Sequence, residues 1–331
     1  MSRLRCRLLL GVAGLSLCAG AKDRAGWMKE ARWGVMTHFL AEWIAPAAHK
    51  DVEEWNKLVG QFNVEGLAKQ LASVGAGYYL ITIGQNSGFY VSPNSTYDRY
   101  VGIRPSKCSR RDLIADLSQA LQGKGIRLMV YLPSGAPAGD AVAVQALEWQ
   151  RGPYANREFK SKWEQVIREW SLRWGKKVSG WWLDGCYWPN AMYRMAEPPN
   201  FASLAAAARA GNPASILAFN HGVIYSLISI SEQEDYTAGE ANEPERVILK
   251  GSRFANRRVD GAYPHMLSYL GQTWGQGGPR FSDEQVIEWT RSLVRAGAAV
   301  TWDAPMQPDG LIGEPFVRQL AAVGKALNPE R

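Results

Sequence analysis

An aspartate that ends an apolar run is the residue best placed for chemistry in this sequence. Residues 180–183 read Gly-Trp-Trp-Leu and are followed directly by Asp184. An unpaired carboxylate is costly to bury, so we expect this side chain to face an opening. Gly185 permits a tight turn there, and Tyr187 and Trp188 supply aromatic faces on which a ligand can stack. The alternative role for Asp184 is the N-cap of a following helix, since Asp is a preferred cap.

A second carboxyl group is available in residues 232–245, which contain six acidic residues. Such a stretch is ordinarily a solvated loop, but Tyr236, Gly239 and Pro244 indicate a loop of defined shape. Glycosidases use two carboxyl groups that flank the scissile bond, one of them often with a raised pKa. Together with aromatic residues that can stack on sugars, these acids predict a glycoside hydrolase. The pattern leaves open which acid acts with Asp184: Glu232, Glu234, Glu240 or Glu243.

The elements that position these residues follow an alternating pattern of short apolar runs and amphipathic stretches, which is typical of a parallel sheet with helices. Six strands are predicted, at 34–38, 77–83, 127–132, 180–184, 215–220 and 298–303. Five helices are predicted, at 64–74, 112–122, 157–174, 201–210 and 283–295. An eight-stranded barrel needs two more strands, from 228–236 and 266–273, where the pattern is weak.

We therefore predict a (β/α)8 TIM-type barrel that forms a single catalytic domain over residues 22–331. A doubly wound open sheet is the alternative, but no Gly-rich phosphate loop follows the first strand. No Pro-rich or Ser-rich linker divides the chain.

Polar and aromatic residues at the carboxyl ends of the strands are candidates for ligand binding, because barrel enzymes place their active sites there. The candidates are His38, Trp43, Gln85, Asn86, Tyr131 and Trp302. Asn220 and Asp303 also end predicted strands. Each residue alone has a structural alternative: His38 can be a hydrogen-bonded core histidine, and Asn86 can be a turn residue.

The first 21 residues read as a secretory signal. Three arginines within residues 3–7 precede an apolar run at 8–18, and the small residues 19–21 form a cleavage site. We predict cleavage after Ala21 and a secreted or periplasmic protein, with no membrane attachment afterwards. The apolar run is shorter than the ~20 residues of a spanning helix. A lipoprotein anchored through Cys18 is the alternative, but the preceding Leu17 is large where a small residue is expected.

Composition narrows the classes of partner. The 331 residues are 46% hydrophobic and 21% charged, as in globular proteins, and the net charge of +7 falls to +4 without the three leader arginines. No basic stripe is present, so a nucleic-acid partner is not expected. Four histidines without close Cys/His spacing do not predict a zinc site. Cys108 and Cys186 remain after cleavage, and the sequence leaves open both their pairing and the oligomeric state.

Six stretches resemble, in order, motifs of the α-L-fucosidases of glycoside hydrolase family 29. They are 27–38, 62–68 through 88–89, 182–185, 235–240, 271–275 and 302–312. Residues 182–185 are similar to the family's W-F-D-G, and the resemblance implies that Asp184 is the nucleophile. Glu240 follows a stretch similar to D-Y/F-x-T-P-E, which implies the acid/base role. His38 matches a sugar-binding histidine that ends the family's first strand.

The chain also departs from that family. The family's H-H-D-G-F, whose histidines bind fucose hydroxyls, is replaced by residues 85–89, Gln-Asn-Ser-Gly-Phe. Asp303 stands where the family has asparagine, and the chain ends at Arg331 without the β-sandwich of many members. The resemblance implies a retaining exo-glycosidase that needs no metal or organic cofactor. Alternatives are a glycosidase of the same fold acting on another sugar, and a non-catalytic carbohydrate-binding relative.

Overall fold

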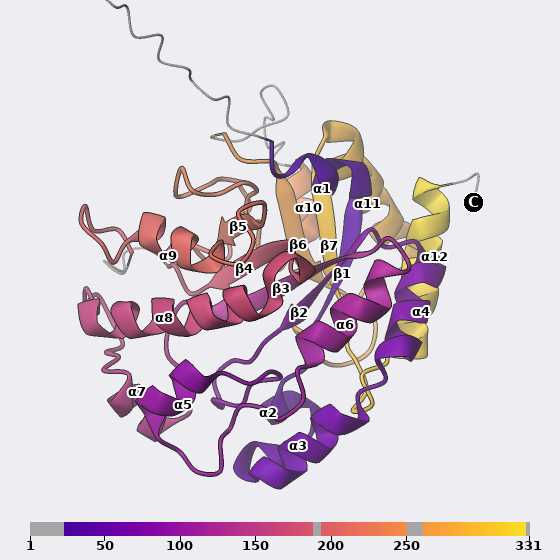
Figure 1. The fold of residues 1–331 in the computed structure, drawn as a ribbon. Coiled ribbons are helices and arrows are strands. Elements are labelled where there is room, and N and C mark those ends of the chain that lie inside the picture. Colours follow the sequence, from indigo (N-terminus) through magenta and orange to yellow (C-terminus); the bar gives the residue numbers. More distant parts are fainter. Residues whose placement is uncertain (1–22, 188–192, 250–260, 329–331) are drawn as a thin grey trace, which may run out of the picture.

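The computed structural model describes residues 23–187, 193–249 and 261–328. Within these residues, seven parallel strands form one sheet in the order β5-β4-β3-β2-β1-β7-β6 (Figure 1). They are β1 (Trp33–Thr37), β2 (Tyr78–Thr82), β3 (Arg127–Pro133), β4 (Gly180–Asp184), β5 (Ile216–Phe219), β6 (His265–Tyr269) and β7 (Ala299–Asp303). All six predicted strands are confirmed. The predicted leader, residues 1–21, and Trp188 lie outside the described residues.

The gap between β5 and β6 is closed by residues 235–241 rather than by a regular strand. Asp235 donates its backbone N–H to the Leu217 carbonyl in β5, at 2.9 Å. On the other side, parallel bridges join Tyr236 to Tyr263 and Glu240 to Leu267. The weak strand predicted at 266–273 is therefore found as β6, whereas the one predicted at 228–236 is wrong.

A glycine explains why residues 235–241 are not a regular strand. Gly239 has a φ of +61°, and a Cβ atom placed there would lie 1.9 Å from the His265 carbonyl oxygen. Only glycine fits this left-handed position against the β6 backbone. The distortion sets the direction in which the following residue, Glu240, enters the barrel.

Side chains alternate between the inside and the outside of the curled sheet, as the two-residue period of strands requires. The interior contains a compact apolar cluster that includes Met36, Leu80, Met129, Trp182 and Leu267. The outward residues of the same strands form the larger core beneath the helices. The predicted (β/α) barrel architecture is thereby confirmed, while the assignment of 22–331 to a single domain stays a prediction.

Helices cover the outer face of the sheet. The longer ones are α4 (Val64–Val74), α6 (Leu113–Gln122), α8 (Arg157–Trp174), α9 (Phe201–Ala208), α11 (Asp283–Ala296) and α12 (Glu314–Leu327). A further helix, α3 (Val52–Gln61), lies beyond the carboxyl ends of the strands (Figure 1). The five predicted helices are confirmed, each within two residues at either end. Asp112 caps α6 by accepting the Ala115 N–H, and Ser282 forms a capping box at the start of α11.

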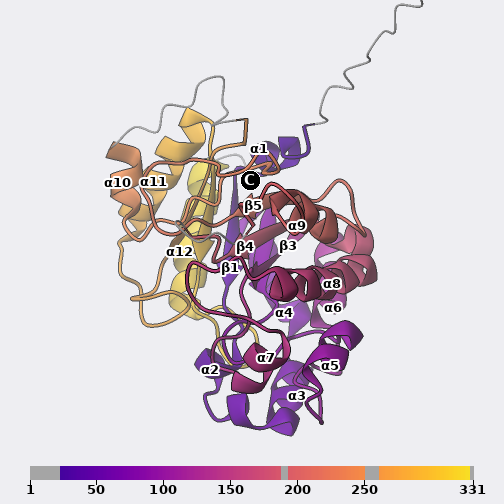
Figure 2. The same ribbon diagram turned by 90° about the vertical axis from the view of Figure 1, so that its left-hand side faces the viewer.

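The remaining helices are short, and four of them lie at the ends of the barrel. They are α1 (Gly26–Ala31), α2 (Ala41–Ile44), α5 (Ser95–Val101), α7 (Ala141–Ala146) and α10 (Pro244–Leu249). Because α2, α5 and α7 follow β1, β2 and β3, they lie beyond the carboxyl ends of the strands, whereas α1 lies at the opposite end (Figures 1 and 2). In the described part of the chain no helix is long and apolar enough to cross a membrane. Cys108 and Cys186 are buried free thiols and do not pair.

Candidate active site

The last inward-facing side chains of several strands converge at the carboxyl end of the barrel. Each lies two residues beyond a member of the interior apolar cluster: His38 after Met36, Tyr131 after Met129, and Asp184 after Trp182. The side chains enclose a pocket of about 240 Å³. It is lined by Met36, His38, Trp43, Gln85, Tyr131, Trp182, Asp184, Tyr187, Glu240, Leu267 and Trp274.

Asp184 lies in this pocket with donors to both carboxylate oxygens. Tyr131 donates its hydroxyl to Oδ2 at 2.6 Å. Oδ1 accepts from the Asn220 amide at 2.8 Å, the Gly185 backbone N–H at 2.7 Å and the Tyr187 hydroxyl at 3.3 Å. An ionised carboxylate only accepts hydrogen bonds, so four donors match its charged form and hold it in one orientation. Gly185 reaches its position because it adopts a φ of +78°.

Glu240 faces Asp184 across the pocket. The Asn220 Nδ2 atom donates to Asp184 Oδ1 at 2.8 Å and to Glu240 Oε2 at 2.7 Å. Because one nitrogen bridges both groups, these two oxygens are at most about 5.5 Å apart. Burial, reinforced by the negative charge of Asp184, raises the pKa of Glu240 to about 7, against the lowering effects of Asn220 and His38.

The other acids of residues 232–245 have different surroundings. Glu234 is buried and accepts backbone N–H groups from Phe219, Ile230 and Ser231, so it holds the loop together. Glu232 is exposed. Glu243 pairs with Arg246 on the surface at 2.6 Å. Of the four candidate acids, Glu240 is the one that lines the pocket of Asp184.

His38 is held in the pocket wall by a buried carboxylate that the sequence analysis left without a role. His38 Nδ1 lies 2.9 Å from Asp303 Oδ1, and Asp303 Oδ2 accepts the Gly275 N–H at 2.6 Å. The His38 ring packs against Trp43, with 4.9 Å between ring centroids. With Nδ1 engaged, the Nε2 atom is left to contact a ligand hydroxyl, and Asp303 fixes which nitrogen carries the proton.

The charge of Asp303 should therefore matter for ligand binding. A carboxylate accepts from both His38 and Gly275, whereas the amide of Asp303→Asn accepts on one side only and loses a hydrogen bond in either orientation. We expect kcat/KM to fall about 10- to 100-fold, mostly through KM, since a hydrogen bond to a charged group contributes about 1.5–3 kcal/mol. Steady-state kinetics measures this, with the exposed Asp283→Asn as control. Unchanged kinetics would contradict the positioning role of Asp303.

Gln85 and Tyr131 form a chain of hydrogen bonds that reaches Asp184. Gln85 Nε2 donates to the Tyr131 hydroxyl at 2.8 Å, and Tyr131 donates to Asp184. The Gln85 Oε1 atom is buried without a hydrogen-bond partner in the described part of the chain. A buried acceptor of this kind is costly unless a ligand or water donates to it.

The predicted binding residues are not all in the pocket. His38, Trp43, Gln85 and Tyr131 line it, but Trp302 does not. The Trp302 side chain is 0% exposed and donates its indole N–H to Thr290 in α11 at 3.0 Å. Neighbouring strand residues point to opposite faces, so Asp303 faces the barrel interior and Trp302 faces the helices. The prediction that Trp302 binds ligand is thus corrected.

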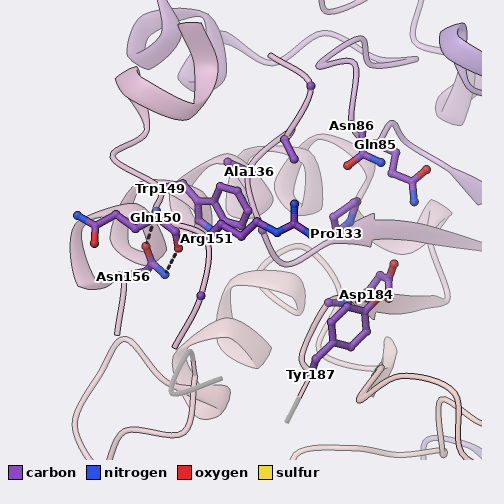
Figure 3. Close-up of a pocket in the computed structure, with 15 residues that line it drawn as sticks. Gln85, Asn86, Pro133, Ala136, Trp149, Gln150, Arg151, Asn156, Asp184 and Tyr187 are labelled. Atoms are coloured by element: carbon purple, nitrogen blue, oxygen red, sulfur yellow. Dashed lines mark hydrogen bonds between the residues drawn. The ribbon is translucent and has the colours of Figure 1, made fainter. Parts of the chain in front are cut away.

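Asn86 lies outside the main pocket, in an adjoining groove of about 550 Å³ (Figure 3). The groove and the pocket share Gln85, Asp184 and Tyr187. Its far side is formed by residues 149–152 and Asn156, which the sequence analysis did not single out.

Sequence reasoning also assigned no role to Asn220, Trp182, Leu267 or Trp274. Asn220 was visible as a polar residue that ends a strand, and it turns out to join the two carboxyl groups. That Trp182 faces the barrel interior together with Asp184 could have been predicted from the two-residue period of a strand. Trp274 was visible as an aromatic residue within the family-like stretch 271–275, whereas nothing in the sequence indicated Leu267 as a pocket residue.

An α/β barrel with two carboxyl groups across a pocket at the carboxyl ends of its strands is the architecture of a glycoside hydrolase. A family model described as alpha-L-fucosidase matches residues 21–330. The chain belongs to the α-L-fucosidase family, and it is a glycosidase that acts on carbohydrate. No curated protein matches the sequence.

Solved structures share the fold at low sequence identity. An endo-fucoidan hydrolase of glycoside hydrolase family 107 has a TM-score of 0.69 and 17% identity, over 92% of this chain and 93% of that one. An α-L-fucosidase in complex with Fuca(1,6)GlcNAc has a TM-score of 0.62 and 15% identity, over 93% and 98%. Isoenzyme 1 of α-L-fucosidase from Paenibacillus thiaminolyticus has a TM-score of 0.63 and 17% identity, over 93% and 76%. The chain spans only part of the length of other endo-fucoidan hydrolases of this fold, 53% of one and 64% of another.

Proposed function

We propose that this protein is a retaining exo-glycosidase of α-L-fucosidase type, which removes a terminal sugar by double displacement. The observation that carries the proposal is the Asn220 bridge, which keeps the facing oxygens of Asp184 and Glu240 within about 5.5 Å. Retaining glycosidases separate their carboxyl groups by about 5–5.5 Å, whereas inverting ones need roughly 6.5–9.5 Å to admit a water molecule.

The two carboxyl groups divide the chemistry according to their environments. Asp184, held as a carboxylate by four donors, attacks the anomeric carbon and forms a covalent glycosyl-enzyme. Glu240, whose pKa is raised to about 7, protonates the leaving oxygen as its bond breaks. In the second step Glu240 takes a proton from water, which displaces Asp184 and restores the original anomeric configuration.

The pocket suits one terminal sugar ring. Its volume of about 240 Å³ lies below the roughly 300–1,000 Å³ of sites that hold drug-sized molecules. Trp182 and Leu267 supply an apolar floor, and Trp43 and Trp274 supply aromatic walls. His38 and the unpartnered Oε1 atom of Gln85 are available for sugar hydroxyls.

The identity of the sugar is tested with a panel of aryl glycosides. Family membership favours α-L-fucose, but Gln85 and Asn86 replace the two histidines that bind fucose hydroxyls in the family pattern, so we expect aryl α-L-fucosides to be weak substrates. Another sugar, or a larger glycan, should be cleaved better. High turnover of an aryl fucoside that no other glycoside matches would contradict the expected change of specificity. Cleavage of nothing, with sugar binding retained, would favour a non-catalytic relative.

We also propose that the protein is exported and that its mature form begins at Lys22. The basic and then apolar start, followed by the small residues 19–21, supports this. The intact mass of exported protein should match residues 22–331. A mass that includes Met1 would rule out cleavage at this site.

A further inference from the structure

We propose that the groove beside the pocket holds a neighbouring unit or a substituent of the glycan substrate, and that Arg151 selects those that carry a negative charge, such as a uronate carboxylate or a sulfate ester. This inference rests on the proposed glycosidase function and names the class of its substrate. The groove is a natural continuation of the pocket, because Gln85, Asp184 and Tyr187 line both. A substituent or a neighbouring unit of a sugar in the pocket has this space beside it.

Arg151 is the one cationic side chain among the described residues that line the groove. It extends from its loop into the groove towards Pro133, on the side where Gln85 and Asp184 lie (Figure 3). Within the described residues its guanidinium has neither a hydrogen-bond partner nor an ion-pair partner. An arginine carries its charge at any ordinary pH and presents a planar fork that fits carboxylate and sulfate oxygens.

The acids around the groove do not neutralise this charge, because they already have partners. Asp140 pairs with Lys107 at 2.7 Å, and Glu148 pairs with Lys162 at 2.7 Å. Asp184 is the only acid among the described lining residues, and it already accepts four hydrogen bonds. The groove therefore presents a positive charge that has no protein partner among the described residues, on an exposed side chain, to whatever occupies it.

The loop that carries Arg151 is shaped before any ligand binds. Asn156 accepts the Gln150 N–H at 2.8 Å and donates to the Gln150 carbonyl at 3.0 Å, closing the loop around residues 151–155 (Figure 3). Next to it, the Trp149 indole lines the groove and makes an edge contact with Phe159, with centroids 6.4 Å apart. Trp149 thus offers a stacking surface for a second sugar ring, beside a cation that can bind its charged substituent.

The test measures binding, so that it does not depend on hydrolysis. Ligand-observed NMR titrations compare glucose, glucuronate and glucose 6-sulfate on the full chain and on Arg151→Ala. We expect the wild-type protein to bind one or both anions about five- to tenfold more tightly than glucose, as for a charge-assisted hydrogen bond in a partly solvated groove. Arg151→Ala should lose that preference while its affinity for glucose changes less than twofold. The two anions distinguish a carboxylate from a sulfate source.

Two controls separate charge recognition from loop structure. Arg168→Ala removes an arginine from the outer face of α8, where it lines a different hollow, and should keep the preference. Raising the salt concentration from 20 to about 300 mM should weaken the preference, because it shortens the screening length of exposed charges. Equal binding of glucose and both anions by the wild type would overturn the proposal. So would no binding at all, or an equal loss of all three ligands in Arg151→Ala.

Hydrolysis then tells failure of the inference from failure of the proposed function. If the aryl glycoside panel is cleaved but Arg151→Ala leaves anion binding unchanged, the inference about the groove fails and the glycosidase proposal stands. If nothing is cleaved but the anion preference depends on Arg151, the groove binds as proposed and the catalytic proposal fails.

Discussion

Replacing Asp184 by glycine should lower turnover by at least about 10⁴-fold, as expected when a nucleophile is removed. The fold should survive, because Asp184 ends β4 at the pocket, Asn220 keeps its hydrogen bond to Glu240, and the Gly185 N–H can donate to water. Azide fits the vacated space and should restore cleavage of an activated aryl glycoside. Its direct attack gives a glycosyl azide of inverted configuration, which NMR identifies.

The wild-type enzyme should release a first-formed sugar that keeps the substrate's anomeric configuration, since two displacements each invert it. Asp184→Asn is the matched variant, because it keeps an acceptor oxygen for Tyr131 while removing the nucleophilic charge. It should be as inactive as Asp184→Gly but gain little from azide. An inverted first product from the wild type, or near-normal activity of Asp184→Gly, would refute both the role of Asp184 and the retaining mechanism.

Replacing Glu240 by alanine should slow hydrolysis of substrates with poor leaving groups by about 10²–10⁴-fold, the usual contribution of positioned proton transfer. An activated aryl glycoside, whose leaving group needs no proton, should lose far less in its first step. Azide should then yield a glycosyl azide of retained configuration, because it attacks the glycosyl-enzyme formed on Asp184. Glu232→Ala, in the same acidic stretch but exposed, is the matched control and should have wild-type rates.

The pH profile is a second measurement of the same group. Glu240 donates a proton only in its neutral form, and burial beside Asp184 raises its pKa to about 7. As pH rises through about 7, the carboxyl group ionises, so kcat/KM on a poor leaving group should fall about tenfold per pH unit. In Glu240→Gln this alkaline limb should be absent. If Glu243→Ala or Glu234→Ala, rather than Glu240→Ala, slows only substrates with poor leaving groups, the acid/base role belongs to that residue.

Much of the fold could be predicted because strands, helices and helix caps depend on residue types and spacings within short segments of the sequence. The run that ends at Asp184 showed both a buried strand and a carboxylate at its open end. The amphipathic periods of α4 and α8 predicted both ends of these helices to the exact residue. The error at 228–236 has a different origin: the segment that closes the barrel is bent at Gly239, and its pairing depends on contacts with β5 and β6.

The candidate site could be predicted only in part. Residue types and strand ends indicated Asp184, His38 and Tyr131, and the family resemblance singled out Glu240 from its acidic neighbours. The prediction that Trp302 binds ligand could have been avoided from the sequence. Trp302 and Asp303 are consecutive residues of one strand and must face opposite sides of the sheet. With Asp303 inside, Trp302 had to pack under the helices.

By itself, the sequence determined most of the barrel strands, the presence of a carboxylate at the end of one of them, and the aromatic residues near the strand ends. These features depend on residue type and on periods of two or 3.6 residues. Tertiary structure alone decided that Asn220 bridges Asp184 and Glu240, and that Asp303 holds His38 from 265 residues away. It also decided that Arg151, which has no partner within the described residues, lines the same groove as Asp184. Hydrogen bonds and charge interactions between segments that are distant in sequence depend on how the sheet curls, and no local sequence pattern predicts that curvature.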